Sequence, residues 1–254
     1  MIARTLSIVV LCYAFMTPTA AMENGESAPT GRYQIERTIA DILDEETLDL
    51  VGEMATLDDK VTWSVHVPDT YDPRKPAGLL VYVSPTNRGW MPRGWSDVVD
   101  EENLIWIAAN GAGNKVPVAR RVILAAVAPS LIAESHTLNP NRVYLAGFSG
   151  GGKVSGMIAP DFPNLFRGAI YIGGAAFWAH DEHPCLQNIR RNRYVFIAGS
   201  ADFNLGLTKR IYHRYLGAGV ENSKLMVIRG MDHDTPNATD IRRAIRYLDT
   251  LDSN

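Results

Sequence analysis

Residues 141–158 read NRVYLAGFSGGGKVSGMI. The segment Arg142–Ala146 is apolar and β-branched enough to predict a buried strand, and Gly151–Ile158 predicts a helix. Between them lies a turn that is rich in glycine. A strand that passes through a tight turn directly into a helix is the repeating unit of proteins with a parallel sheet. This stretch therefore places the chain in the α/β class.

The same alternation of strand and helix continues on both sides of this stretch. Continuous apolar runs, such as LLVYV at 79–83 and YVFIAG at 194–199, are typical of strands that are covered on both faces. We therefore expect one doubly wound, mostly parallel sheet with helices on both faces. The other predicted strands are Val61–Val67, Leu79–Ser84, Leu104–Ala108, Ala169–Ile172, Tyr194–Ala198 and Leu225–Ile228. The other predicted helices are Val116–Thr137, Leu205–Leu216 and Asn237–Leu251.

The composition excludes several classes of protein. Of the 254 residues, 46% are hydrophobic and 21% are charged, and these are the proportions of a folded globular chain rather than a disordered one. Two cysteines cannot make a disulfide-rich scaffold. A net charge of −3 gives no general electrostatic reason to bind nucleic acid. No nucleic-acid partner is expected, and the composition leaves the oligomeric state open.

The N-terminal residues resemble a targeting signal. Arg4 precedes an apolar run at Leu6–Met16, and small residues end at Ala21, which is typical of a secretory signal at 1–21. The run is shorter than the roughly 20 residues that span a bilayer. We expect a secreted or periplasmic protein without stable membrane insertion after cleavage. Residues 22–32 are predicted to be a mobile polar tail and 33–254 a single domain, beginning with a helical segment at 33–60.

The turn at 147–151, Gly-Phe-Ser-Gly-Gly, matches G-x-S-x-G. Between a strand and a helix, this pattern is the nucleophile elbow of serine hydrolases, in which a strained turn exposes the hydroxyl of Ser149. The glycines at 147 and 151 let the strand and the helix approach closely. The amide of Gly150 then lies at a helix N-terminus, where it can donate to an oxyanion.

Two other interpretations of this turn were considered. Gly147 to Lys153 also spells G-x-x-x-x-G-K, but the phosphate-binding loop needs Ser or Thr next, and Val154 stands there. A glycine-rich turn without chemistry is the second alternative. The partners of Ser149 must decide between them.

An acid and a base follow in the order that this hydrolase architecture requires, which is Ser, then acid, then His. Asp202 comes directly after the strand at 194–198, and His233 comes after the strand at 225–228. The carboxyl ends of parallel strands meet at one edge of the sheet. We therefore predict a triad in which His233 is the general base and Asp202 orients it. Asp232 and Asp234 flank the histidine, but neighbours in sequence rarely reach its Nδ1.

The segments NRVYLAGFSGGG (141–152), FIAGSADFN (196–204) and IRGMDHDTP (228–236) resemble the α/β-hydrolase superfamily. Within it they are similar to secreted esterases of the polyhydroxybutyrate depolymerase-like and feruloyl-esterase-like groups. The resemblance covers roughly residues 60–252. It implies a serine esterase that acts on a small-molecule or oligomeric ester through an acyl-enzyme, with no cofactor and no metal.

The sequence departs from these relatives at the loop that supplies the second oxyanion donor. Where they commonly carry His-Gly, this chain reads SPTNRGW from 84 to 90. Pro85 has no N–H to donate, so the prediction falls on the amide of Thr86, with the hydroxyls of Ser84 and Thr86 as alternatives. The resulting hypotheses are an esterase, a thioesterase or peptidase with the same machinery, and a catalytically silent binding protein of the same fold.

Aromatic residues near the predicted site are candidates for substrate binding, namely Trp90, Trp95, Phe148 and Trp178. For Trp90 and Trp95, ordinary packing of their loop against the sheet is the alternative. The loop that contains His180, His183 and Cys185 is too weak a pattern to predict zinc.

Overall fold

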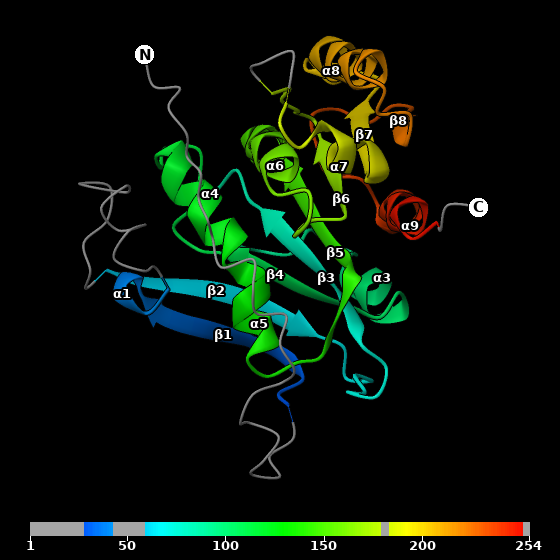
Figure 1. Cartoon of the computed structure of the whole chain (residues 1–254). Coiled ribbons are helices and arrows are strands. Elements are labelled where there is room, and N and C mark those ends of the chain that lie inside the picture. Colours follow the sequence, from blue (N-terminus) through cyan, green and yellow to red (C-terminus); the bar gives the residue numbers. More distant parts are fainter. Residues whose placement is uncertain (1–27, 43–58, 179–182, 251–254) are drawn as a thin grey trace.

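The computed structural model describes residues 28–42, 59–178 and 183–250, which build a sheet between two layers of helices (Figure 1). In this part of the chain the sheet has the order β1-β2-β4-β3-β5-β6-β7-β8. Strand β2 is antiparallel to β1 and to β4. The other six strands, β4, β3, β5, β6, β7 and β8, are parallel to one another. The predicted fold class is confirmed. The strands are β1 (Gly31–Thr38), β2 (Lys60–Val67), β3 (Ala77–Val83), β4 (Leu104–Ala109), β5 (Leu138–Phe148), β6 (Gly168–Ile172), β7 (Arg193–Gly199) and β8 (Ser223–Ile228).

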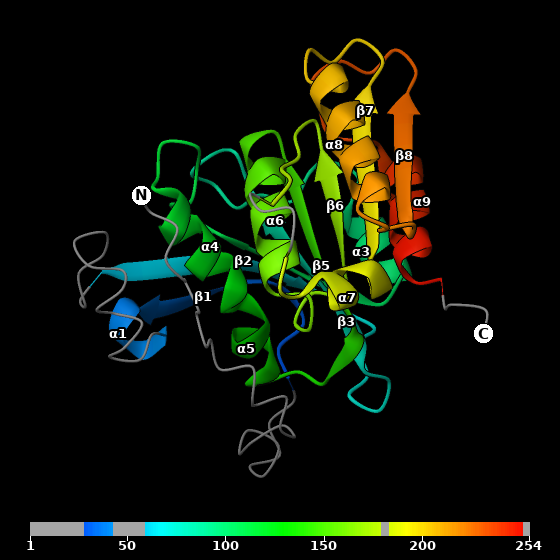
Figure 2. The ribbon, with the colours of Figure 1, turned by 45° about the horizontal axis from the view of Figure 1, so that its top comes forward.

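The helices cover both faces of the sheet, and each face has its own hydrophobic core. One core is closed by α4, α5, α6, α7 and α8, and the other by α3 and α9. Figure 2 shows the strong twist of the sheet, whose β1 and β2 edge runs across the direction of β7 and β8. The helices are α1 (Ile39–Ile42), α3 (Ser96–Glu101), α4 (Val118–Ala126), α5 (Ala128–Ala133), α6 (Gly150–Asp161), α7 (Leu186–Arg191), α8 (Leu205–Gly217) and α9 (Ala238–Leu248).

Strand β3 shows why the apolar runs become strands covered on both sides. All its residues are buried. Leu79 and Val81 contribute to the first core, and Leu80 and Tyr82 to the second, because successive side chains of a strand point to opposite faces. The parallel strands then end at one edge of the sheet, and this edge carries the loops of the predicted site.

The helix predicted for residues 33–60 is wrong for 33–38 and for Lys60, whereas Ile39–Ile42 is helical as predicted. Residues 43–58 lie outside the described part. Residues 31–38 form β1, and Lys60 begins β2. Along β1 the half-buried Tyr33 and Ile35 alternate with exposed polar residues, which is the two-residue period of a strand. The tail predicted at 22–32 also overlaps this strand, since Gly31 and Arg32 belong to it. Residues 1–21 lie outside the described part as well.

The single helix predicted for 116–137 is two helices. Helix α4 ends at Ala126 and α5 begins at Ala128, with Pro129 in its first turn. Proline has no N–H for the helical hydrogen bond, and its ring clashes with the preceding turn. The short helices α3 and α7 were not predicted. None of the described helices is long and apolar enough to cross a bilayer.

A buried histidine ties the described N-terminal residues to the domain. His136 is 2% exposed, and its Nε2 donates to the carbonyl of Pro29 at 2.9 Å. Its Nδ1 accepts from the hydroxyl of Ser135 at 2.9 Å. Both ring nitrogens are therefore satisfied by the neutral form. Burial lowers the pKa of His136 below its ordinary value of 6.5.

This burial predicts a pH-dependent contribution to stability. The unfolded chain binds a proton at His136 below about pH 6.5 and the folded protein resists it, so this contribution is full above that pH and falls as the pH decreases. We expect His136→Gln to be less stable than the wild type at pH 7.5, by a margin that shrinks at pH 5.5. Urea unfolding of both proteins at the two pH values measures this, and an unchanged margin contradicts it.

Candidate active site

Ser149 lies in the strained turn between β5 and α6. It has φ 55° and ψ −118°, a backbone conformation that is rare outside glycine. Its amide donates to the carbonyl of Ile172 at 2.8 Å, which fixes the turn on β6. A Cβ on Gly151 would overlap the carbonyl oxygen of Val83 at the end of β3. The glycine at 151 therefore lets the helix start directly against the sheet, as the elbow motif predicts.

The structure brings together the three residues of the predicted triad. Nε2 of His233 lies 2.8 Å from Oγ of Ser149, and Nδ1 of His233 lies 3.0 Å from Oδ1 of Asp202. Asp202 follows β7 and His233 follows β8, so the three groups come from loops at the same edge of the sheet. With Nδ1–H donating to the carboxylate, Nε2 is left to accept the proton of the serine hydroxyl.

Asp202 is held rigidly for this role. Its side chain is 0% exposed, and Oδ1 also accepts the amide of Asn204 at 2.7 Å. The side chain of Asn204 in turn donates to the carbonyl of Gly173 at 2.8 Å. Burial and the two hydrogen bonds that Oδ1 accepts, from the Asn204 amide and from His233, hold this carboxylate toward the histidine.

His233 lies between two aromatic rings. The ring of Phe148 is 4.8 Å from the imidazole, and the ring of Phe203 is 4.2 Å from it. Phe203 is 78% exposed, which is unusual for so large an apolar side chain. Phe148 was among the predicted substrate-binding residues, whereas Phe203, the immediate neighbour of the predicted acid, was not. An exposed aromatic beside the base offers an apolar surface to a substrate.

The predicted second oxyanion donor, Thr86, is already engaged. Its amide donates to Oγ of Ser84 at 3.1 Å, and its hydroxyl lies 3.1 Å from the carbonyl of Arg88, where it can only donate. Oγ of Ser84 lies 3.1 Å from Oγ1 of Thr86 and donates to it. The amide and both hydroxyl protons therefore bond within the loop. The prediction that Thr86 donates to an oxyanion is wrong for this conformation, and so is the hydroxyl alternative.

A different side chain, that of Asn114, lies against Gly150. A Cβ on Gly150 would overlap Oδ1 of Asn114, and it would lie 2.9 Å from Nδ2 of the same residue. The amide of Asn114 donates to the carbonyl of Pro85 at 2.9 Å, and the amide of Gly113 donates to Oδ1 of Asn87 at 3.1 Å. The loop after β4 is thus tied to the loop after β3, and it presents a carboxamide next to the nucleophile.

A buried cation joins the same two loops. Arg121 is 4% exposed, and its guanidinium donates to the carbonyl of Ala112 at 2.8 Å and to that of Ser84 at 3.0 Å. The two loops therefore form one rigid unit next to Ser149. The sequence analysis could not find Asn114, because a lone asparagine in a loop after a strand matches no motif.

The three tryptophan candidates have different positions. Trp95 is 0% exposed, and its indole N–H donates to the carbonyl of Pro236 at 2.9 Å. Trp178 is 7% exposed and stacks on Phe177 at 3.9 Å in the first core. Both rings are packing residues, so their prediction as substrate-binding residues is wrong. Trp90 is 65% exposed and lines a cavity outside the triad.

The His180 and His183 loop is partly outside the described residues. His180 lies within 179–182, which are not described. Nε2 of His183 lies 3.1 Å from Oδ1 of Asp161, and Nδ1 accepts the amide of Cys185 at 3.1 Å. Both nitrogens of His183 are therefore used within the protein.

Gly173 packs against the triad and gives a test of its geometry. Its φ is +56°, and a Cβ there would lie 3.0 Å from Oδ2 of Asp202 and 3.1 Å from the ring of His233. We expect Gly173→Ala to lose about 1–2 kcal/mol of stability from the left-handed backbone and about 1–3 kcal/mol more from crowding. Gly111→Ala is the matched control, because its φ is +64° and nothing lies within 4 Å of its Cβ. Urea unfolding gives both values, and equal losses contradict the crowding.

Comparison with known proteins shows the fold. No protein-family model matches the chain, and no curated protein matches its sequence. A ferulic acid esterase superimposes with a TM-score of 0.59 at 15% identity, covering 87% of this chain and 97% of that one. An esterase from Rhizomucor miehei gives a TM-score of 0.63 at 14% identity, covering 88% and 83%.

Peptidases share the same architecture. The dipeptidyl peptidase 4 of Porphyromonas gingivalis gives a TM-score of 0.57 at 14% identity over 92% of this chain, which spans only 37% of that longer protein. The chain likewise spans 35% of a dipeptidyl aminopeptidase IV from Bacteroides ovatus. The order of the sheet, the strained serine turn and these superpositions lead to one conclusion. The chain has the fold of the α/β-hydrolase superfamily, which its sequence motifs resemble.

Proposed function

We propose that this protein is a serine hydrolase that cleaves carboxylic esters through an acyl-enzyme. The observation that carries the proposal is the continuous hydrogen-bonded series from Ser149 through His233 to Asp202. Such a series, with the serine on a strained elbow, activates a hydroxyl that is otherwise a weak nucleophile.

Each residue of the proposed triad has a role in the reaction. Oγ of Ser149 attacks the ester carbonyl while Nε2 of His233 takes its proton, and Asp202 stabilises the imidazolium without being protonated. The tetrahedral intermediate collapses, the ester C–O bond breaks, and His233 gives its proton to the departing alkoxide. Water then attacks the acyl group and gives one proton to His233. The bond between the acyl carbon and Oγ of Ser149 breaks, His233 returns the proton to Oγ, and the acid is released from the free serine.

We propose that the oxyanion of each tetrahedral intermediate is bound by the amide of Gly150 and the side-chain amide of Asn114. As the first residue of α6, Gly150 has an N–H without an acceptor in the helix. Asn114 lies against the same residue, and the donors of Ser84 and Thr86 are engaged elsewhere. Side-chain carboxamides serve as oxyanion donors as well as backbone amides do.

An ester is the substrate class that this site supports best. The exposed ring of Phe203 adjoins the base and offers an apolar surface for an acyl or aryl group. Two of the superimposed proteins are named as esterases. A thioesterase or peptidase would use the same triad, and a panel of esters, thioesters and peptide amides separates the three. We also propose a secreted or periplasmic location, on the signal-like residues 1–21.

A catalytically silent binding protein is the second candidate. It is favoured by the loop at 84–88, whose serine and threonine donors bond within the loop. The two candidates differ in whether Ser149 reacts.

The triad variants test the proposed function. With p-nitrophenyl acetate and butyrate as substrates, we expect Ser149→Ala to abolish turnover and Asp202→Asn to lower kcat about 10⁴-fold, because the wrong histidine tautomer then faces the serine. Ser155→Ala is the matched control, since Ser155 is a buried serine of the same helix with no hydrogen-bond partner for its hydroxyl among the described residues. It should keep wild-type turnover and labelling by a fluorophosphonate probe. Equal turnover by Ser149→Ala and wild type would support the silent candidate.

A second series tests the oxyanion donor. We expect Asn114→Ala to lower kcat by about 10²–10³-fold with little change in KM, because the lost donor acts only on the developing charge. Asn188→Ala removes an exposed carboxamide of α7 that donates to Oδ1 of Asn164, and it should leave kcat unchanged. If Asn114→Ala keeps full kcat while Ser149→Ala is inactive, the protein is a hydrolase with a different second donor.

A further inference from the structure

A cavity of about 630 Å³ lies outside the triad, on the face of the sheet that carries α3. Its floor is built from β1, β2 and β4, and its wall is the loop from Gly89 to Gly94, continued by Ser96. Neither Ser149, Asp202 nor His233 lines it. Its volume is in the range of cavities that hold small molecules.

The strand register places three different side chains in one row on this floor. Arg32 of β1 is paired with His66 of β2, and His66 is paired with Trp106 of β4. Directly paired residues share a face of the sheet and lie within contact distance. The row therefore runs from a guanidinium through an imidazole to an indole.

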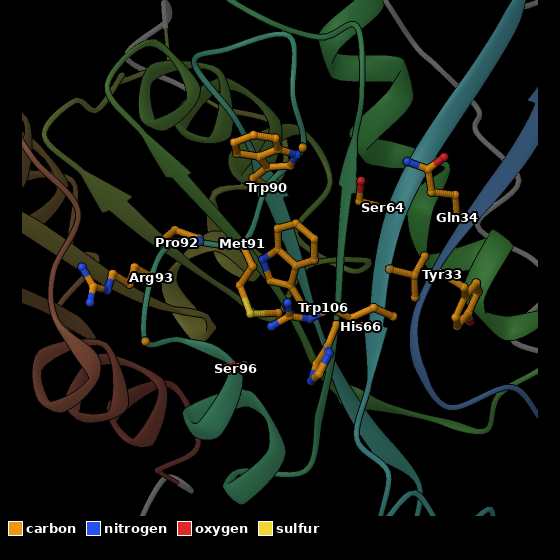
Figure 3. A pocket seen from close by; sticks show the side chains of 14 residues that line it. Tyr33, Gln34, Ser64, His66, Trp90, Met91, Pro92, Arg93, Ser96 and Trp106 are labelled. Carbon is orange, nitrogen blue, oxygen red and sulfur yellow. The ribbon is translucent and has the colours of Figure 1, made fainter.

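The wall of the cavity is apolar and aromatic. Figure 3 shows Trp90, Met91 and His66 arranged around the ring of Trp106. Trp90 is 65% exposed, although its loop is fixed on both sides by hydrogen bonds from the Gly89 amide to Asn110 and from the Trp95 indole to Pro236. The guanidinium of Arg88 lies over the Trp90 ring, 4.6 Å from its centroid. The rest of this large exposed indole, on a firmly held loop, is suited to stack a flat ligand.

The permanently charged side chains that line the cavity are all positive. Arg32 and Arg93 line it, and no aspartate or glutamate does. The carboxylate of Asp100, which is outside the lining, is bound to Nε2 of His66 at 2.7 Å. A guanidinium at the end of a flat apolar cavity favours a carboxylate, which it can bind through two hydrogen bonds.

Three residues of the lining have a buried polar atom without a partner among the described residues. These atoms are the hydroxyl of Tyr33, Nδ1 of His66 and Nε1 of Trp106, and Trp106 is only 2% exposed. A buried polar atom without a hydrogen bond is destabilising, and it calls for a partner that the protein itself does not supply. Met91, which is flexible and unbranched, lies beside Trp106 and can move to admit one (Figure 3).

We propose that this cavity is a second ligand site, which binds small planar carboxylates, with Arg32 holding the carboxylate and Trp90 stacking the flat body. The site is independent of the proposed hydrolase chemistry, because it shares no residue with the triad.

Isothermal titration of the full chain with 2-naphthoate, and with the neutral isostere 2-naphthamide, tests the proposal. We expect saturable binding of the acid and binding of the amide weaker by about ten-fold or more, since the ion-paired hydrogen bonds are lost. Arg32→Gln and Trp90→Ala should each weaken the binding of 2-naphthoate by about ten-fold. Trp90→Phe should keep most of the wild-type affinity, because it retains a flat ring.

The controls separate this cavity from the triad and from general charge effects. Arg243→Gln removes an exposed arginine of α9, outside this cavity, and Ser149→Ala removes the proposed nucleophile. Both should bind naphthoate within about two-fold of the wild type. Equal affinity for the acid and the amide, equal effects of Arg32→Gln and Arg243→Gln, or loss of binding in Ser149→Ala would each overturn the proposal.

Discussion

The start of α6 lies so close to the end of β3 that no side chain fits between them, and the rest of the site depends on this contact. A Cβ on Gly151 would overlap the carbonyl of Val83. Since the helix cannot move away, the turn before it must bend sharply, and Ser149 takes the strained conformation with φ 55°. The strain points the hydroxyl out of the sheet, where the loops after β7 and β8 supply its partners. The local cost is offset by the fully buried strands on both sides.

The loops at this edge of the sheet form two pairs, and each pair positions different groups of the site. Those after β7 and β8 hold the acid and the base, and their hydrogen bonds leave Asp202 no alternative orientation. Those after β3 and β4 are joined by Arg121 and Asn87, and they bring a carboxamide to Gly150. In the proposed mechanism, the first pair sets the proton transfer, and the second pair sets the charge environment of the reacting carbonyl. The same β3 loop then continues into the wall of the second cavity.

Much of the fold and of the triad could be predicted because both depend on local patterns. Buried strands have an apolar run, and the elbow, the acid and the base each follow such a strand. What could not be predicted depends on hydrogen bonds between distant loops. Thr86 was chosen because Pro85 has no N–H, but nothing in the sequence shows that Ser84 accepts the Thr86 amide. Asn114 comes close to Gly150 only because two loops are tied together. Trp95 and Trp178 resemble exposed aromatics in sequence, and only tertiary packing buries them.

The segment Asp202-Phe203-Asn204 combines three tasks within three consecutive residues. The first orients the base, the second covers its ring, and the third anchors the turn to Gly173. Because these tasks share one short turn, an insertion or deletion there disturbs all of them together. The 84–96 loop has its fixed points spread over Asn110, Pro236 and Arg121. Efforts to redirect the specificity of this scaffold should therefore vary the exposed positions of that loop and leave the length of the 202–204 turn unchanged.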